Sequence, residues 1–219
     1  MAELRSEEEQ LDAIKEWWKS NGTALLVGIV VAAALVLGWH AWQRHQENQS
    51  AEASVTYQQL IAIAASDSPD DKARAQAFEL ADKLESDHGG TLYADLAGLI
   101  EAKLAVGGND DARARKALEP VIADSDRPYM QGLAKLELAR LQIAAKDADS
   151  ALKTLDGSFP EALEAQRQAV RGDAFVSLDR DDDARQAYQE AQNLAQASDQ
   201  TLYGLQLKLD DLGAKDATP

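Results

Sequence analysis

The sequence contains no cysteine, which excludes a thiolate nucleophile and a cysteine zinc site. Glycine-rich phosphate loops, the G-x-S-x-G elbow and the H-E-x-x-H zinc motif are also missing. The three histidines, His40, His45 and His88, lie far apart or near turns, and we expect them to be exposed and solvated. We therefore predict a protein that is not an enzyme, with no catalytic residue, no cofactor and no metal ligand.

Basic residues are scarce: 22 Lys and Arg stand against 38 Asp and Glu, which gives a formal net charge of -16. Residues 1–22 hold three bases and six acids, so the rest of the chain carries 19 bases, 32 acids and a charge of -13. Nucleic-acid binding depends on clustered Lys and Arg, and this surface would repel phosphates. Nucleic acid is therefore excluded as a partner, and the acidity is expected to keep the domain soluble.

One acidic segment imitates a calcium-binding loop. Acids occupy the first, third, fifth and twelfth positions of the segment from Asp179 to Glu190. The sixth position, where the loop needs glycine, is Ala184, and the second half has a helical pattern. We interpret the segment as an inter-helix turn whose acids lie favourably at a helix start, with calcium binding as the alternative.

What the sequence does contain is one long apolar run, TALLVGIVVAAALVLGW, from Thr23 to Trp39. Extended to Trp42 it covers 20 residues, and a helix of that length spans about 30 Å, the thickness of a bilayer core. We predict a transmembrane helix over 23–42. A buried core helix is normally shorter, and a cleaved signal is disfavoured by the acidic amino end and the lack of an A-x-A site.

Two sets of residues mark this segment as a membrane helix. Aromatic residues that form the expected interfacial belt flank it on both sides: Trp17, Trp18, Trp39 and Trp42. Small residues spaced four apart form a candidate helix-packing stripe: Ala24, Gly28 and Ala32, with Ala34 and Gly38. The stripe would let another transmembrane helix approach closely. The alternative is that these residues only lower the hydrophobicity of a lipid-facing helix.

The orientation follows from the positive-inside bias. Arg5, Lys15 and Lys19 precede the span, whereas only Arg44 follows it closely. We expect residues 1–22 to be a short acidic cytoplasmic tail with an amphipathic helix, whose apolar face would rest on membrane lipid. The remaining domain would lie in the periplasm of a Gram-negative bacterium, anchored in the inner membrane.

The chain after the span is rich in Ala, Leu and Gln and poor in β-branched and aromatic residues, which predicts an all-α domain. We expect a helical linker over 43–66 that continues the anchor, a repeat domain over 67–214 and a disordered tail over 215–219. Ser68 and Pro69 are expected to begin a helix, and Pro120 to kink or shorten one. Further helices are expected at 92–104, 110–123, 130–144, 147–155, 161–178, 182–195 and 199–212, joined by short turns into antiparallel hairpins.

A weak period links these hairpins. The second helices align at Ala117, Ala151 and Ala187, which are 34 and 36 residues apart. The preceding helices align at Ala102, Ala139 and Ala174, spaced 37 and 35. Spacings near 34 with a small residue at each helix crossing are typical of tetratricopeptide arrays, although the Trp, Leu-Gly and Pro of the consensus are missing or displaced.

The segments DAIKEWWKSNG (12–22), GWHAWQRHQ (38–46) and KDADSALKTLDG (146–157), around the anchor and in the helical domain, carry a family resemblance. The chain resembles the ancillary subunit of the SecYEG translocon, a single-span inner-membrane protein with a tetratricopeptide-like periplasmic domain. The resemblance implies a non-enzymatic role that passes exported polypeptides toward periplasmic chaperones. It implies as partners SecYEG, unfolded secreted polypeptides and a membrane-anchored periplasmic chaperone of the prolyl-isomerase type.

The residues alone support capture without chemistry, because stacked hairpins form a concave face and tethering raises the local concentration of that face. Two other functions stay open: a membrane-anchored scaffold of another envelope complex, and a regulator of an envelope stress signalling pathway. The short cytoplasmic tail disfavours an output domain.

Overall fold

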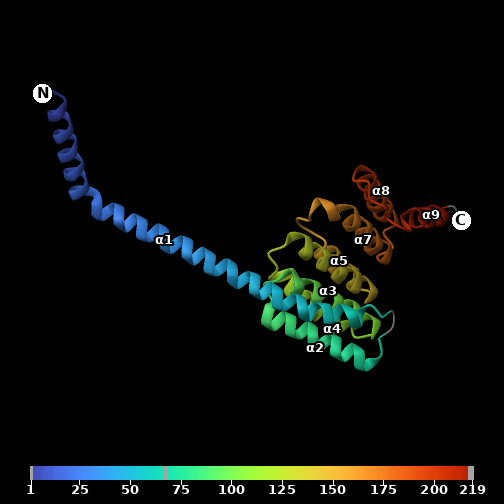
Figure 1. Cartoon of the computed structure of the whole chain (residues 1–219). Helices are drawn as coiled ribbons and strands as arrows, with labels where there is room; N and C mark the ends of the chain where they lie inside the picture. Colours follow the sequence, from blue (N-terminus) through green and yellow to red (C-terminus); the bar gives the residue numbers. More distant parts are fainter. Residues whose placement is uncertain (1, 67–68, 217–219) are drawn as a thin grey trace. The chain divides into compact units, whose positions relative to one another are not determined.

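The computed structural model describes residues 2–66 and 69–216, and these contain helices and no strand (Figure 1). The predicted all-α fold is confirmed. The helices are α1 (Ala2–Ala64), α2 (Asp71–His88), α3 (Leu92–Gly107), α4 (Asp111–Ala123), α5 (Pro128–Ala144), α6 (Ala148–Thr154), η1 (Glu161–Leu163, 3-10), α7 (Glu164–Ser177), α8 (Asp181–Ala197) and α9 (Leu205–Asp216).

The first of two compact units, residues 1–49, is built from α1 alone. It contains the only helix of the described residues that is long and apolar enough to cross a membrane. Only 6% of the most apolar window of that helix is buried, unlike the core helix of a soluble domain. As expected, α1 continues without a break through residues 43–64.

The second compact unit begins at Ser50, so the last turns of α1 belong to it. Ala53 and Leu60 are fully buried and form a core with Ala77, Leu84 and side chains of α3. The end of α1 therefore shares one core with α2 and α3. The expected start of the repeat domain at residue 67 therefore lies later than the start of this unit.

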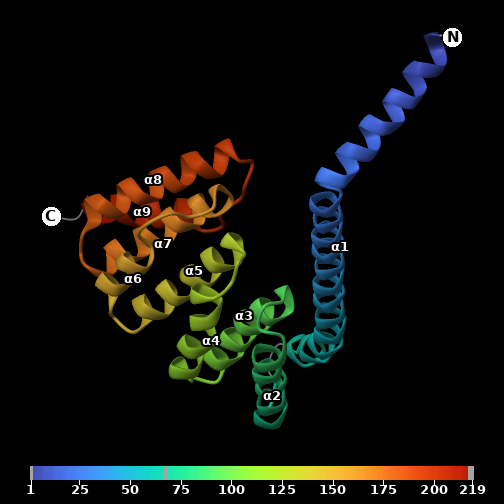
Figure 2. The same ribbon diagram turned by 90° about the vertical axis from the view of Figure 1, so that its left-hand side faces the viewer.

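The second unit is a stack of helix hairpins, in which α3 packs on α4, α5 on α6, and α7 on α8 (Figure 2). Successive first helices also touch, α3 with α5 and α5 with α7. The six alanines of the predicted period are all buried, at 7% exposure or less: Ala102, Ala117, Ala139, Ala151, Ala174 and Ala187. A larger side chain at these positions would hold the two helices of a hairpin apart. The hairpin array is therefore confirmed.

The turns repeat one conformation that the sequence analysis did not predict. Asn109, Lys146, Asp179 and Asp199 all have φ between 53° and 62° and follow the end of a helix. At Lys146 the backbone N–H donates to the Ile143 carbonyl, and the next N–H, of Asp147, donates to Gln142. This pair of bonds is the Schellman motif, in which glycine is the usual residue. The left-handed residue therefore ends each of these helices, although it is not the glycine usually found at this position.

Because L side chains pay a steric cost at positive φ, replacing Lys146 with glycine is expected to stabilise the fold by up to about 1 kcal/mol. Urea unfolding of both proteins measures this difference. A matched change at Lys153, which lies inside α6, should instead destabilise by about 1 kcal/mol. Equal effects at the two positions would contradict the turn assignment.

One expected helix start is wrong. The helix expected at Ser68 and Pro69 begins at Asp71, because the Asp70 carboxylate accepts the Ala73 N–H at 2.7 Å and caps it; Ser68 lies outside the described residues. The helix that contains Pro120 reaches Ala123, its expected end, and the Asp124 N–H donates to the Pro120 carbonyl, so Pro120 does not shorten it.

The last helix also departs from the expectation. α9 begins at Leu205 instead of residue 199, after Gly204 at φ +78°. It continues to Asp216, so the first two residues of the expected disordered tail 215–219 are helical, and residues 217–219 lie outside the described ones.

His88 is buried, at 8% exposure, and the expectation of a solvated side chain was wrong. It shares the buried face of α2 with Ala77, Ala81 and Leu84. The spacings of four, three and four residues place all of them on one side of the helix.

Candidate functional site

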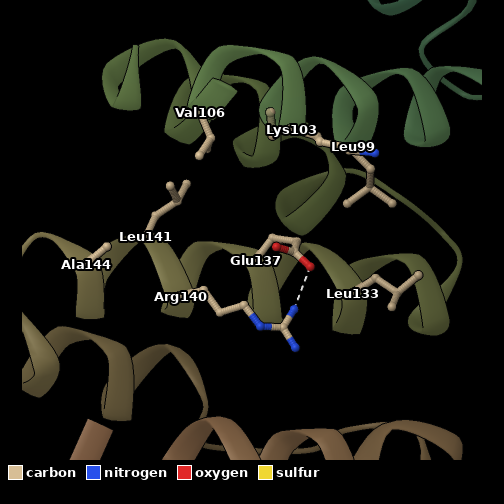
Figure 3. Close-up of a pocket in the computed structure, with 9 residues that line it drawn as sticks. Leu99, Lys103, Val106, Leu133, Glu137, Arg140, Leu141 and Ala144 are labelled. Carbon is tan, nitrogen blue, oxygen red and sulfur yellow. Dashed lines mark hydrogen bonds and ion pairs between the residues drawn. The ribbon is translucent and has the colours of Figure 1, made fainter. Parts of the chain in front are cut away.

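The first candidate site is a hollow of about 520 Å³ between α3 and α5, which we name the α3–α5 groove (Figure 3). Both are first helices of consecutive hairpins. Its lining consists of Leu99, Ala102, Lys103 and Val106 from α3, with Leu133, Glu137, Arg140, Leu141 and Ala144 from α5. The volume falls within the roughly 300–1,000 Å³ of ligand-sized pockets.

The lining of the groove is mostly apolar, with charged groups among it. Val106 and Leu141 point toward each other from the two helices (Figure 3), and Val106 is 44% exposed. Arg140 Nη1 donates to Glu137 Oε1 at 2.6 Å. Lys103 adds a second cation. The groove therefore offers apolar contact with an excess of one positive charge.

A second hollow of about 300 Å³, the α7–α9 cleft, lies beside α5, α7 and the segment leading into α9. Its lining includes Arg140, Gln166, Asp173, Thr201 and Lys208. It is more polar than the α3–α5 groove. Because Arg140 lines both hollows, the two adjoin at this side chain.

Two charged side chains of the α7–α9 cleft, Asp173 and Lys208, are held in place by hydrogen bonds. The Tyr188 hydroxyl and the Lys208 ammonium each donate to Asp173 Oδ1 at 2.6 Å. Burial, and then the bond to the Asp173 carboxylate, raise the pKa of Tyr188 above its usual value. Tyr188 therefore stays protonated and serves as a fixed donor that orients Asp173.

A partly buried ion cluster lies where α2, α3 and α4 meet. Arg113 Nε is 2.6 Å from Glu101 Oε1, and Arg113 Nη2 donates to both Asp82 carboxylate oxygens at 2.9 and 3.0 Å. The guanidinium also stacks 4.1 Å from the Phe78 ring centroid. Burial raises the pKa of Glu101 to about 7, although Arg113 opposes the shift. The cluster joins three helices and is a structural site.

The raised pKa makes stability depend on pH. Between its ordinary value of 4.5 and about 7, the folded Glu101 carboxyl binds a proton more tightly than the unfolded chain does. Its contribution to stability is therefore full below pH 4.5 and is lost as pH rises through 7. Glutamine cannot titrate, so from pH 5 to pH 8 the free energy of unfolding of Glu101→Gln should rise relative to the unchanged protein. An identical difference at both pH values in urea titrations would contradict this.

The calcium-like segment is not a loop. Residues from Asp181 onward are in α8, and only Asp179 and Arg180 form the turn before it. Arg180 Nε donates to Asp183 at 2.7 Å, and Arg185 Nη1 to Asp182 at 3.0 Å. These carboxylates pair with arginines near the positive end of the helix dipole. The segment is therefore an inter-helix turn followed by the acidic first turn of α8.

The residues predicted within the span are exposed along α1. The small-residue stripe, Ala24, Gly28, Ala32, Ala34 and Gly38, touches no other element of its own unit. An added Cβ at Gly28 or Gly38 would meet no atom within 4 Å. The four tryptophans are more than half exposed, and the rings of Trp39 and Trp42 lie 5.2 Å apart. The stripe and the belt therefore remain available for contacts outside this chain.

Comparison with known proteins places this architecture in a family. The tetratricopeptide repeat-like domain family matches residues 15–214. A relative named "Ancillary SecYEG translocon subunit" from Aggregatibacter actinomycetemcomitans is 32% identical over 212 residues, covering 97% of this chain and 100% of the relative. Relatives of the same name come from Escherichia coli strain K12 (32% identical, 84% of this chain, 86% of the relative) and Haemophilus influenzae (29%, 97% and 100%). No solved structure gives a significant match.

Proposed function

The chain belongs to the family of ancillary SecYEG translocon subunits, and we propose that it is a non-enzymatic accessory subunit of the Sec translocon that receives exported polypeptides. The observation that carries the proposal is the apolar α3–α5 groove on consecutive first helices of a repeat domain. Grooves of this kind on stacked hairpins serve extended contacts with other chains. The chain would hold a polypeptide and pass it to a membrane-anchored periplasmic chaperone of the prolyl-isomerase type.

The anchor fixes where this capture happens. The exposed apolar part of α1 would cross the inner membrane once, with the interfacial belt of four tryptophans at the lipid headgroups. Three bases before the span and one soon after it favour a cytoplasmic amino end. The repeat domain would then meet polypeptides as they leave the translocon, at a high effective concentration.

The small-residue stripe is the proposed contact with the translocon. Replacing Gly28 and Ala32 with leucine should abolish recovery of SecYEG with the tagged chain from membranes solubilised in mild detergent. The added side chain at Gly28 meets nothing in this chain, so the fold of its own unit should be kept. The matched control replaces Val27 and Val31, also four apart on the same helix, with leucine and should recover SecYEG normally. Unchanged recovery with both pairs would show that the stripe faces lipid.

The orientation has a separate test. Protease added to spheroplasts should digest the repeat domain, and carbonate washing should leave the chain in the membrane. Protection of the domain from protease, or release by carbonate, would overturn the proposed placement.

A further inference from the structure

We propose that the occupant of the α3–α5 groove and the α7–α9 cleft is an extended polypeptide segment in which apolar side chains are followed by an acidic one. This inference rests on the proposed function and adds the chemistry of the segment. The α3–α5 groove would take the apolar side chains, Arg140 the carboxylate, and the α7–α9 cleft the polar backbone that follows.

The shape of the site favours an extended chain. The two hollows, of about 520 and 300 Å³, adjoin at Arg140, and three first helices in a row border them. A single small ligand would fill one hollow and leave the other. A linear segment can occupy both, and the polar side chains of Gln166, Asp173 and Thr201 can bond its backbone amides and carbonyls.

The charge at the junction favours an acidic residue. Lys103 and Arg140 outnumber Glu137 in the α3–α5 groove, whereas the chain after residue 22 carries -13 overall. At physiological ionic strength charges beyond about 8 Å are largely screened, so the local cations decide the preference. Arg140 is about half exposed and, within residues 2–66 and 69–216, is bonded only through Nη1 to Glu137, which leaves further N–H donors for an incoming carboxylate.

The test uses the full chain in phosphatidylcholine nanodiscs and fluorescence anisotropy, with empty nanodiscs as the blank. The probe is a fluorescein-labelled peptide in which leucines alternating with serines are followed by aspartates, and its counterpart has lysines instead. The aspartate peptide should bind about threefold more tightly, a difference of the size of a partly exposed ion pair. Arg140→Gln should remove that preference.

A second variant tests the apolar contact made by the α3–α5 groove. Val106→Asn should weaken binding of both peptides about fivefold, because it removes apolar contact at a partly exposed position where the fold tolerates change. Lys116→Gln, an exposed change on α4 outside both hollows, should alter neither peptide.

The outcomes separate the two proposals. Tighter binding of the lysine peptide, which the net charge of the chain alone would favour, overturns this inference. A preference for the aspartate peptide that remains in the Arg140→Gln variant overturns it as well. In either case the capture function stands, because peptides are still bound. Failure of both peptides to bind overturns the inference and the capture function together.

Discussion

Replacing Gly98 with alanine is expected to lower the free energy of unfolding by about 1–3 kcal/mol, although alanine normally favours a helix. An added Cβ would lie 2.8 Å from the Ala117 carbonyl oxygen and 2.9 Å from Val121 Cγ2. The first of these atoms belongs to the backbone of α4, so it can yield only if the two helices of the hairpin move apart. The loss should appear as a lower urea midpoint with an unchanged dependence on denaturant.

Gly107 is the matched control for this change. It ends the same helix, and an added Cβ there would meet nothing within 4 Å. Gly107→Ala should therefore leave stability unchanged or raise it slightly. If both variants lose the same stability, the close approach of α3 and α4 is not what Gly98 provides.

Replacing Arg113 with methionine is expected to cost about 2 kcal/mol or more at pH 8. Methionine keeps the packing against Phe78 but leaves Glu101, whose side chain is 7% exposed, without its cation. Breaking a fully buried pair costs about 3–5 kcal/mol, and the 29% exposure of Arg113 moderates this. Equilibrium unfolding in urea measures the loss.

Two comparisons identify the cause. Adding Glu101→Gln to the Arg113 variant should recover much of the loss, because the double variant buries no unpaired charge. Arg140→Met, which breaks the exposed pair with Glu137, should cost only about 0.5 kcal/mol. A double variant no more stable than Arg113→Met alone would show that the cost comes from packing and not from the stranded carboxylate.

The helix crossings could be predicted from the sequence because their requirement is local. Only a small residue fits where the two helices of a hairpin meet, so the alanine period marks the crossings directly, and all six alanines are buried. The continuity of α1 was predictable for a similar reason, since no breaker lies between Gln43 and Ala64.

The groove could not be predicted because it depends on the rotation of each helix within the stack. Leu104 and Val106 look equivalent in the sequence, yet Leu104 is 7% exposed in a core and Val106 is 44% exposed in the groove. For the same reason the sequence did not show that the end of α1 belongs to the repeat domain, where Ala53 and Leu60 share a core with side chains of α2 and α3.

The other wrong expectations could have been corrected from the sequence itself. His88 continues the buried spacing of Ala77, Ala81 and Leu84, which outweighs its polarity and the glycines that follow. The helix expected at 199–212 contains Gly204, whose positive φ places the start of α9 after it, at Leu205.

Photo-crosslinking in native membranes during export tests the central claim most directly, that the α3–α5 groove of an anchored repeat domain receives exported polypeptides. A crosslinking residue at position 106, in the α3–α5 groove, should give adducts with exported chains, identified by mass spectrometry, whereas position 116 on α4 should give few. Adducts of equal yield at both positions, or none with exported chains at position 106, would contradict the account.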